Sequence, residues 1–129
     1  MISYTAIEQD GFIGKIVFGT TTLEWKYDSE SRCCENFGVL FVPFDHNVLD
    51  KAIDKFDLFA DKITIDKTRP EHANSGFVDG ETIEDVQTLW LGFTDGTSYT
   101  ISFYNIHNGY YSHNLDIIVN GSVHWNVAI

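Results

Sequence analysis

The chain has 129 residues and a formal net charge of −11, and 43% of its residues are hydrophobic. This supply of apolar side chains excludes an intrinsically disordered chain and predicts a single globular domain over residues 1–129. No apolar run approaches the ~18 residues of a membrane helix, and the amino terminus lacks a basic region and an apolar signal core. We therefore expect neither a membrane span nor export.

The charge is unevenly distributed along the chain. All eight Lys and Arg residues lie before residue 70, so the second half has acids and no fixed positive charge. Such a chain should not neutralise phosphates, which disfavours direct binding to nucleic acid or to an anionic membrane. The charge favours a basic partner surface, although an acidic composition also serves solubility.

Two adjacent cysteines, Cys33 and Cys34, are the only thiols. Neighbouring residues cannot form a disulfide of ordinary geometry, which excludes a secreted disulfide scaffold and predicts a reducing, cytoplasmic environment. Nothing local activates either thiol as a nucleophile, and a buried structural role is favoured.

The five histidines do not form the closely spaced ligand pairs typical of zinc sites, and no phosphate-binding glycine loop is present. We therefore expect no enzyme activity, no cofactor and no metal. The histidines are His46, His72, His107, His113 and His124.

Alternating apolar residues and turn dipeptides predict a β-rich chain. Phe12–Phe18 and Thr21–Tyr27 flank Gly19-Thr20 as a first hairpin. The second half predicts an antiparallel meander of up to four strands, because Asp-Gly and Asn-Gly between apolar runs are strong hairpin signals. Its strands are Val86–Thr94, Thr97–Ile106, Tyr110–Val119 and Ser122–Val127, with turns at Asp95-Gly96, at a bulged His107-Asn108-Gly109 and at Asn120-Gly121.

Between these regions, residues 48–61 predict an amphipathic helix, because apolar residues recur there at a helical period. They are Leu49, Ala52, Ile53, Phe56 and Ala60. The expected fold is therefore α+β: an antiparallel sheet with two hairpin regions, a carboxyl-terminal meander and one helix packed on it. Residues 68–82 predict a loop. Four aspartates of the helix would form an acidic stripe with neighbours about 5–6 Å apart, or an ordinary solvated face. They are Asp50, Asp54, Asp57 and Asp61.

Two further groups are candidate contact residues for a partner. One is the acidic run of residues 79–85; the other is the tyrosine-rich turn of residues 105–113, because tyrosine protrusions make good contact surfaces. The alternative is a well-formed hairpin whose tyrosines cover the core edge. The individual residues are Asp79, Glu81, Glu84 and Asp85 in the first group, and His107, Asn108, Tyr110 and Tyr111 in the second.

Cys33-Cys34-Glu35 followed by Phe37, and the later Asn108-Gly109-Tyr110-Tyr111, resemble a family of small domains found in phages and large DNA viruses. The correspondence covers roughly residues 12–119. The sequence departs where that family often has a tryptophan after the cysteines, and where it often has arginine before the Asn-Gly-Tyr-Tyr motif. The resemblance implies a viral or prophage origin and no particular reaction.

Small size, strong acidity and this resemblance predict a phage-encoded inhibitor of a host defence or nucleic-acid-processing protein, similar in action to an anti-CRISPR protein. It would dock in the host cytoplasm on a basic surface that otherwise binds nucleic acid. The aspartate stripe and the acidic run of residues 79–85 would supply charge, and Tyr110 and Tyr111 would supply aromatic anchors. The alternatives are a small-ligand-binding or sequestering domain that uses residues 105–113, and a structural protein of the virion.

Overall fold

The computed structural model describes residues 13–28, 36–41, 46–73, 75–106 and 113–129, and these residues form two four-stranded antiparallel sheets. The first sheet has the order β1-β2-β7-β8 and the second has the order β3-β6-β5-β4. We call them sheet A and sheet B. The strands of sheet A are β1 (Ile13–Phe18), β2 (Thr21–Tyr27), β7 (Asn114–Val119) and β8 (Ser122–Ala128). Those of sheet B are β3 (Asn36–Phe41), β4 (Ile53–Thr64), β5 (Thr82–Phe93) and β6 (Ser98–Ile106).

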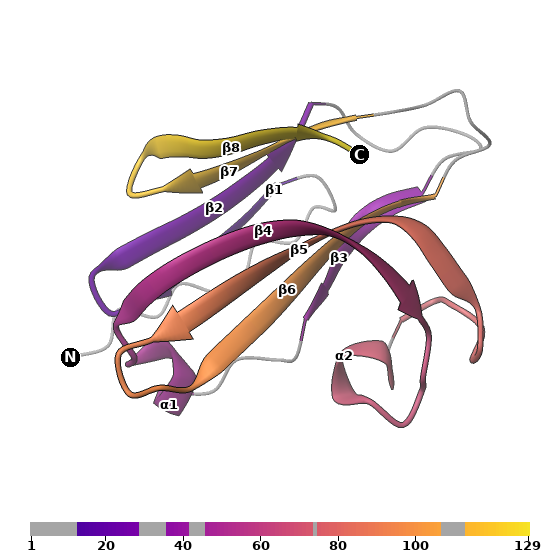
Figure 1. The fold of residues 1–129 in the computed structure, drawn as a ribbon, viewed down its shortest axis with the longest axis horizontal. Helices are drawn as coiled ribbons and strands as arrows, with labels where there is room; N and C mark the ends of the chain where they lie inside the picture. Colours follow the sequence, from indigo (N-terminus) through magenta and orange to yellow (C-terminus); the bar gives the residue numbers. More distant parts are fainter. Residues whose placement is uncertain (1–12, 29–35, 42–45, 74, 107–112) are drawn as a thin grey trace.

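The two sheets face each other as a β-sandwich, with sheet A lying across sheet B in Figure 1. Strand alternation directs one side of each sheet into a shared core. Aromatic rings join the sheets: the Trp25 ring meets Phe103 edge-on at 5.6 Å between centroids and Phe41 at 6.5 Å. Tyr27 packs on Phe37 at 4.5 Å. The core therefore depends on side chains that are distant in sequence.

The predicted turns within each sheet are confirmed. Gly19 has φ 54° between β1 and β2, and Asn120 and Gly121 have φ 50° and 83° between β7 and β8. Positive φ at both central residues is the requirement of a type I′ hairpin turn, which is why Asn-Gly occurs here. Asp95-Gly96 connects β5 to β6. These turns specify which consecutive strands pair.

The predicted four-strand meander is wrong at its middle connection. β6 belongs to sheet B and β7 to sheet A, where β7 pairs with β2 across the register Trp25 to Ile117. The apolar faces of β6 and β7 are both fully buried. Ile101 and Phe103 lie on the face of β6, and Leu115 lies on that of β7. Placing the strands in opposite sheets buries each face against the other. The bulged turn predicted at residues 107–109 lies outside the described residues.

The predicted helix over residues 48–61 is also wrong. The only helices in the described ranges are the short α1 (His46–Leu49) and α2 (Pro70–Ala73), and residues 53–64 form β4 at the edge of sheet B. β4 pairs with β5 along its length, with register shifts between Ile53 and Lys55 and between Asp61 and Ile63. These irregularities break the two-residue alternation that would mark a strand in the sequence. The α+β class is therefore replaced by a largely antiparallel β-sandwich.

The turn between β5 and β6 predicts an acid-sensitive contribution to stability. Hydrogen bonds from the Thr97 hydroxyl and amide, followed by the nearby Lys51 ammonium, lower the pKa of Asp95 from 3.8 to about 2. The pKa of Asp95 is lower in the folded state than in the unfolded state, so its carboxylate stabilises the fold at pH values above 3.8. This stabilisation is lost as the pH falls from 3.8 towards 2. We expect Asp95→Asn to flatten this part of the melting-temperature profile, measured by circular dichroism. The exposed Asp54→Asn is the control, and parallel profiles for Asp95→Asn and wild type would contradict the assignment.

Candidate functional site

The outer face of sheet B, which faces away from the core, carries an unusual row of hydroxyl side chains. Thr88 on β5 lies opposite Ser102 on β6, and Thr100 lies two residues from Ser102 on the same face. Their sequence neighbours Leu89, Ile101 and Phe103 point into the core and are fully buried. Strand alternation therefore brings three hydroxyls together on one polar surface.

Residues 65–73 and 75–81 fold back over one end of this face and bury a second apolar cluster. Ile65 is 1% and Phe77 9% exposed, and the Phe77 ring meets Tyr104 edge-on at 5.0 Å. Backbone hydrogen bonds join Ile65 to Glu81 at 2.7 Å and Gly80 to Ile65 at 2.8 Å. The described part of the predicted loop, residues 68–73 and 75–81, thus covers this face, contains α2 and forms one wall of a cleft.

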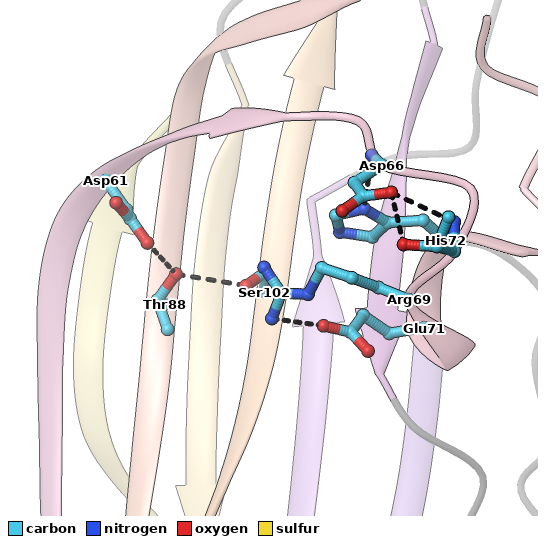
Figure 2. Close-up of polar contacts among 8 residues, drawn as sticks. Asp61, Asp66, Arg69, Glu71, His72, Thr88 and Ser102 are labelled. Atoms are coloured by element: carbon cyan, nitrogen blue, oxygen red, sulfur yellow. Dashed lines mark hydrogen bonds and ion pairs between the residues drawn. The ribbon is translucent and has the colours of Figure 1, made fainter. Parts of the chain in front are cut away.

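The cleft has a volume of about 240 Å³ and lies between the sheet face and α2. Its floor comes from β4, β5 and β6, and its wall from the segment that contains α2, as Figure 2 shows. Polar and apolar side chains both line it: Leu40, Phe59, Asp61, Ile63, Arg69, Glu71, His72, Thr88, Thr100 and Ser102.

A chain of hydrogen bonds crosses the floor of the cleft from β6 to β4 (Figure 2). The Thr88 hydroxyl donates to Asp61 Oδ2 at 2.9 Å, and Thr88 Oγ1 lies 3.0 Å from Ser102 Oγ. Because a hydroxyl has one proton and Thr88 gives its own to Asp61, Ser102 must be the donor of the second bond. The Lys62 amide donates to Asp61 Oδ1 at 2.8 Å. Both carboxylate oxygens are therefore held, and Ser102 Oγ keeps its acceptor lone pairs.

His72 stands in the wall of the cleft and is 2% exposed. The Asp66 amide donates to its Nδ1 at 2.9 Å, so Nδ1 is the acceptor and the neutral ring carries its proton on Nε2. Asp66 is itself held by Thr68, whose hydroxyl and amide donate to Oδ1 at 2.6 and 3.0 Å. These hydrogen bonds from Thr68 lower the pKa of Asp66. The wall is thus fixed by local backbone contacts.

Arg69 and Glu71 form an ion pair at the rim of the cleft (Figure 2). The Arg69 side chain is 57% exposed and that of Glu71 is 14% exposed. The fixed charges of the lining are those of Asp61, Arg69 and Glu71, and their sum is one net negative charge. The cleft offers hydroxyl donors and acceptors, one held carboxylate, one ion pair and one neutral imidazole.

The predicted acidic residues do not form a helical stripe. Asp57 and Asp61 lie on β4, where four residues span about 13 Å rather than one helical turn. Instead, β4 pairs with β5 so that Asp61 lies opposite Val86 and Thr64 lies opposite Thr82. This pairing brings the two predicted acidic groups onto one two-stranded structure, which we call the acidic ribbon. Its members are Asp54, Asp57, Asp61, Glu84 and Asp85, with Asp79 and Glu81 in the preceding turn; Asp50 is exposed just before β4.

Several ribbon acids already have partners. Glu84 pairs with Lys62 at 3.2 Å, the Lys67 amide donates to Asp79 at 2.9 Å, and Glu81 accepts from the Val78 amide at 3.0 Å. A second, shallower hollow of about 160 Å³ lies beside Glu81, Glu84, Asp85 and Asn105, among others. The ribbon surface is therefore acidic but partly neutralised.

The predicted contact residues of the tyrosine-rich turn, His107, Asn108, Tyr110 and Tyr111, lie outside the described residues, as do the cysteines. Sequence reasoning missed the cleft. The alternation of Thr100 and Ser102 with buried Ile101 and Phe103 was an available signal, since it directs hydroxyls outward. No local signal placed Arg69 and His72 over those hydroxyls.

Comparisons with family models, curated proteins and solved structures find no match to this chain. Neither helix of the described chain is long or apolar enough to cross a membrane. Within the same ranges, no three His, Cys, Asp or Glu side chains are grouped so that they could hold a metal ion.

Proposed function

We propose that the protein is a phage-encoded binding protein that inhibits a host defence or nucleic-acid-processing protein by docking on its basic surface. The observation that supports this proposal is the antiparallel pairing of β4 with β5, which gathers acids from residues 54–61 and 79–85 on the acidic ribbon. A partner surface that binds nucleic acid is rich in Lys and Arg, and an acidic surface of a competitor is electrostatically complementary to it.

The ribbon offers unengaged charge as well as paired charge. Asp54 and Asp57 are exposed, and no hydrogen bond or ion pair of either is found among the described residues. Lys62 is committed to Glu84, and Lys51 is committed to Asp95 at 3.1 Å. Lys55 is the ribbon cation that lies nearest to these aspartates in sequence. Charge on the ribbon would accelerate association, and apolar anchors would supply most of the affinity.

The test is capture of partners from a host lysate at two salt concentrations, with mass spectrometric identification. Basic nucleic-acid-binding proteins should be enriched, and both added salt and added DNA should release them. Asp54→Lys/Asp57→Lys should weaken the binding of the captured partner at least about tenfold, because the reversal places positive charge against a basic surface.

Glu24→Lys/Asp116→Lys is the control of equal charge change on sheet A, and circular dichroism should verify its fold, because Asp116 accepts from Asn126 at 2.6 Å. The control should bind like wild type. A complex that resists added salt and still forms with Asp54→Lys/Asp57→Lys would contradict the docking proposal.

A further inference from the structure

The cleft beneath α2 is enclosed enough to hold a small molecule. Its volume of about 240 Å³ is room for roughly eight waters and falls below the size of pockets for drug-like ligands. Its floor is a sheet of three strands, and Thr88 at that floor is only 3% exposed. The site is therefore built on rigid elements, and it needs little rearrangement to bind a ligand of monosaccharide size.

Charge in the cleft disfavours an anionic ligand. Arg69 is already paired with Glu71, and Asp61 adds a negative charge. Among the described lining residues, Asp61 is the carboxylate outside the ion pair, and each of its oxygens accepts one hydrogen bond and keeps acceptor capacity for a ligand donor. The cleft therefore suits an uncharged ligand that donates hydrogen bonds to Asp61, and a small cation is the competing occupant that the charged probe below tests.

Hydrogen bonding in the cleft suits hydroxyl groups. Ser102 donates to Thr88, so its oxygen is an open acceptor, whereas Arg69 keeps N–H groups beyond its ion pair and can donate. Thr100 can do either. A ligand must therefore donate at one end of the floor and accept at the rim. A hydroxyl group donates and accepts at the same atom and can therefore meet either end, whereas an ether only accepts.

An apolar platform lies beside these polar groups. Phe59 is 41% exposed although it is aromatic, and it lines the cleft with Ile63 and Leu40. The C–H faces of a sugar ring are weakly positive and apolar, and an aromatic face is weakly negative. Phe59 can therefore cover one face of a sugar ring while the hydroxyl groups of the sugar reach the floor and the rim of the cleft.

From size, charge, hydrogen bonding and this platform, we infer that the cleft is a binding site for a neutral, hydroxyl-rich molecule of the monosaccharide class. Asp61 and Ser102 orient the ligand by accepting from its hydroxyls, Arg69 donates to it, and Phe59 covers its ring. The inference does not depend on docking by the acidic ribbon.

The test is an NMR titration of the ¹⁵N-labelled full chain with D-glucose, D-galactose and D-mannose, each in turn. At least one sugar should shift the amides of residues 59–63, 69–73, 88 and 100–102 with millimolar affinity. Asp61→Asn and Phe59→Ala should each weaken that binding about tenfold, because each removes an oriented contact. Phe59→Ala changes an exposed ring, so it keeps the test valid if Asp61→Asn fails to fold.

Asp57→Asn is the matched control, because it makes the same chemical change on the same face of β4 outside the cleft, and it should bind like wild type. Inorganic phosphate and ethanolamine serve as charged probes. Shifts at these amides with a charged probe alone, or none with any of the three sugars, would overturn the inference. The ribbon reversal Asp54→Lys/Asp57→Lys should retain sugar binding even if it loses its protein partner, so the two proposals fail separately.

Discussion

Trp25→Ala should destabilise the protein by about 3–5 kcal/mol, the largest loss that we expect from one side chain. Trp25 is 1% exposed and packs on Phe103 and Phe41 of the opposite sheet. It also covers Gly14, where an added Cβ would lie 2.0 Å from the indole ring. Truncation would leave a cavity between the sheets. Small domains are stable by only about 5–15 kcal/mol, so much of the margin would be lost.

Urea unfolding followed by circular dichroism measures this loss. Trp90→Ala is the matched control, since Trp90 is a half-buried tryptophan on the outer face of sheet B that lies over Gly92. The control should cost less than half as much, because its ring is not enclosed between the sheets. Equal losses for the two variants would show that the core between the sheets is not the main source of stability.

The second large effect is a loss of stability in alkali that depends on Tyr27. Burial raises the pKa of Tyr27 well above its ordinary value of 10.0, and the ring is completely buried. A group whose folded pKa is raised contributes stability that is present below the unfolded pKa and is lost as the pH rises above it. Above about pH 10 the free energy of unfolding should therefore fall by about 1.4 kcal/mol per pH unit from this residue.

Urea unfolding at several pH values from neutral to strongly alkaline tests this slope. Tyr27→Phe should remove this pH-dependent slope. The variant should also be less stable than wild type at neutral pH, because it loses the hydrogen bond from the Tyr27 hydroxyl to the Gly38 carbonyl at 2.8 Å. Burial also raises the pKa of Tyr104, so Tyr104→Phe should reduce the slope in the same direction. If wild type and Tyr27→Phe lost stability in parallel above pH 10, the assignment to Tyr27 would be wrong.

The error over residues 48–61 has a physical explanation. Leu49, Ile53 and Phe56 match a helical period, and Ala and Leu have good helix propensity. In the structure, Phe56 and Leu58 pack against the core while Phe59 remains exposed, and two register shifts displace the alternation. β4 is stabilised by its pairing with β5, whose residues begin eighteen positions after β4 ends. Tertiary pairing overrides local propensity here, and a period count does not include that pairing.

The candidate sites were predictable to different degrees. The acids of the ribbon were identified from two sequence runs, residues 50–61 and 79–85, but the geometry predicted for the first run depended on a helix where the structure has β4. Asp61 was selected as a surface charge, whereas the structure assigns its carboxylate to the hydrogen-bond chain with Thr88 and Ser102. That chain crosses three strands, so its members could not be grouped before the strand order was known.

Local chemistry was sufficient for the hairpins. Positive φ at Gly19, Asn120 and Gly121 is favoured by those residue types alone, so β1-β2 and β7-β8 follow from a few neighbouring positions. The division into two sheets was decided by tertiary structure, because the pairing of β2 with β7 joins residues about ninety positions apart. Alternation shows that a strand has an apolar face but not which other face will cover it. The strand pairing that buries apolar faces between the two sheets is therefore a property of the tertiary structure. The tertiary structure also places α2 over the hydroxyls of sheet B, which creates the cleft.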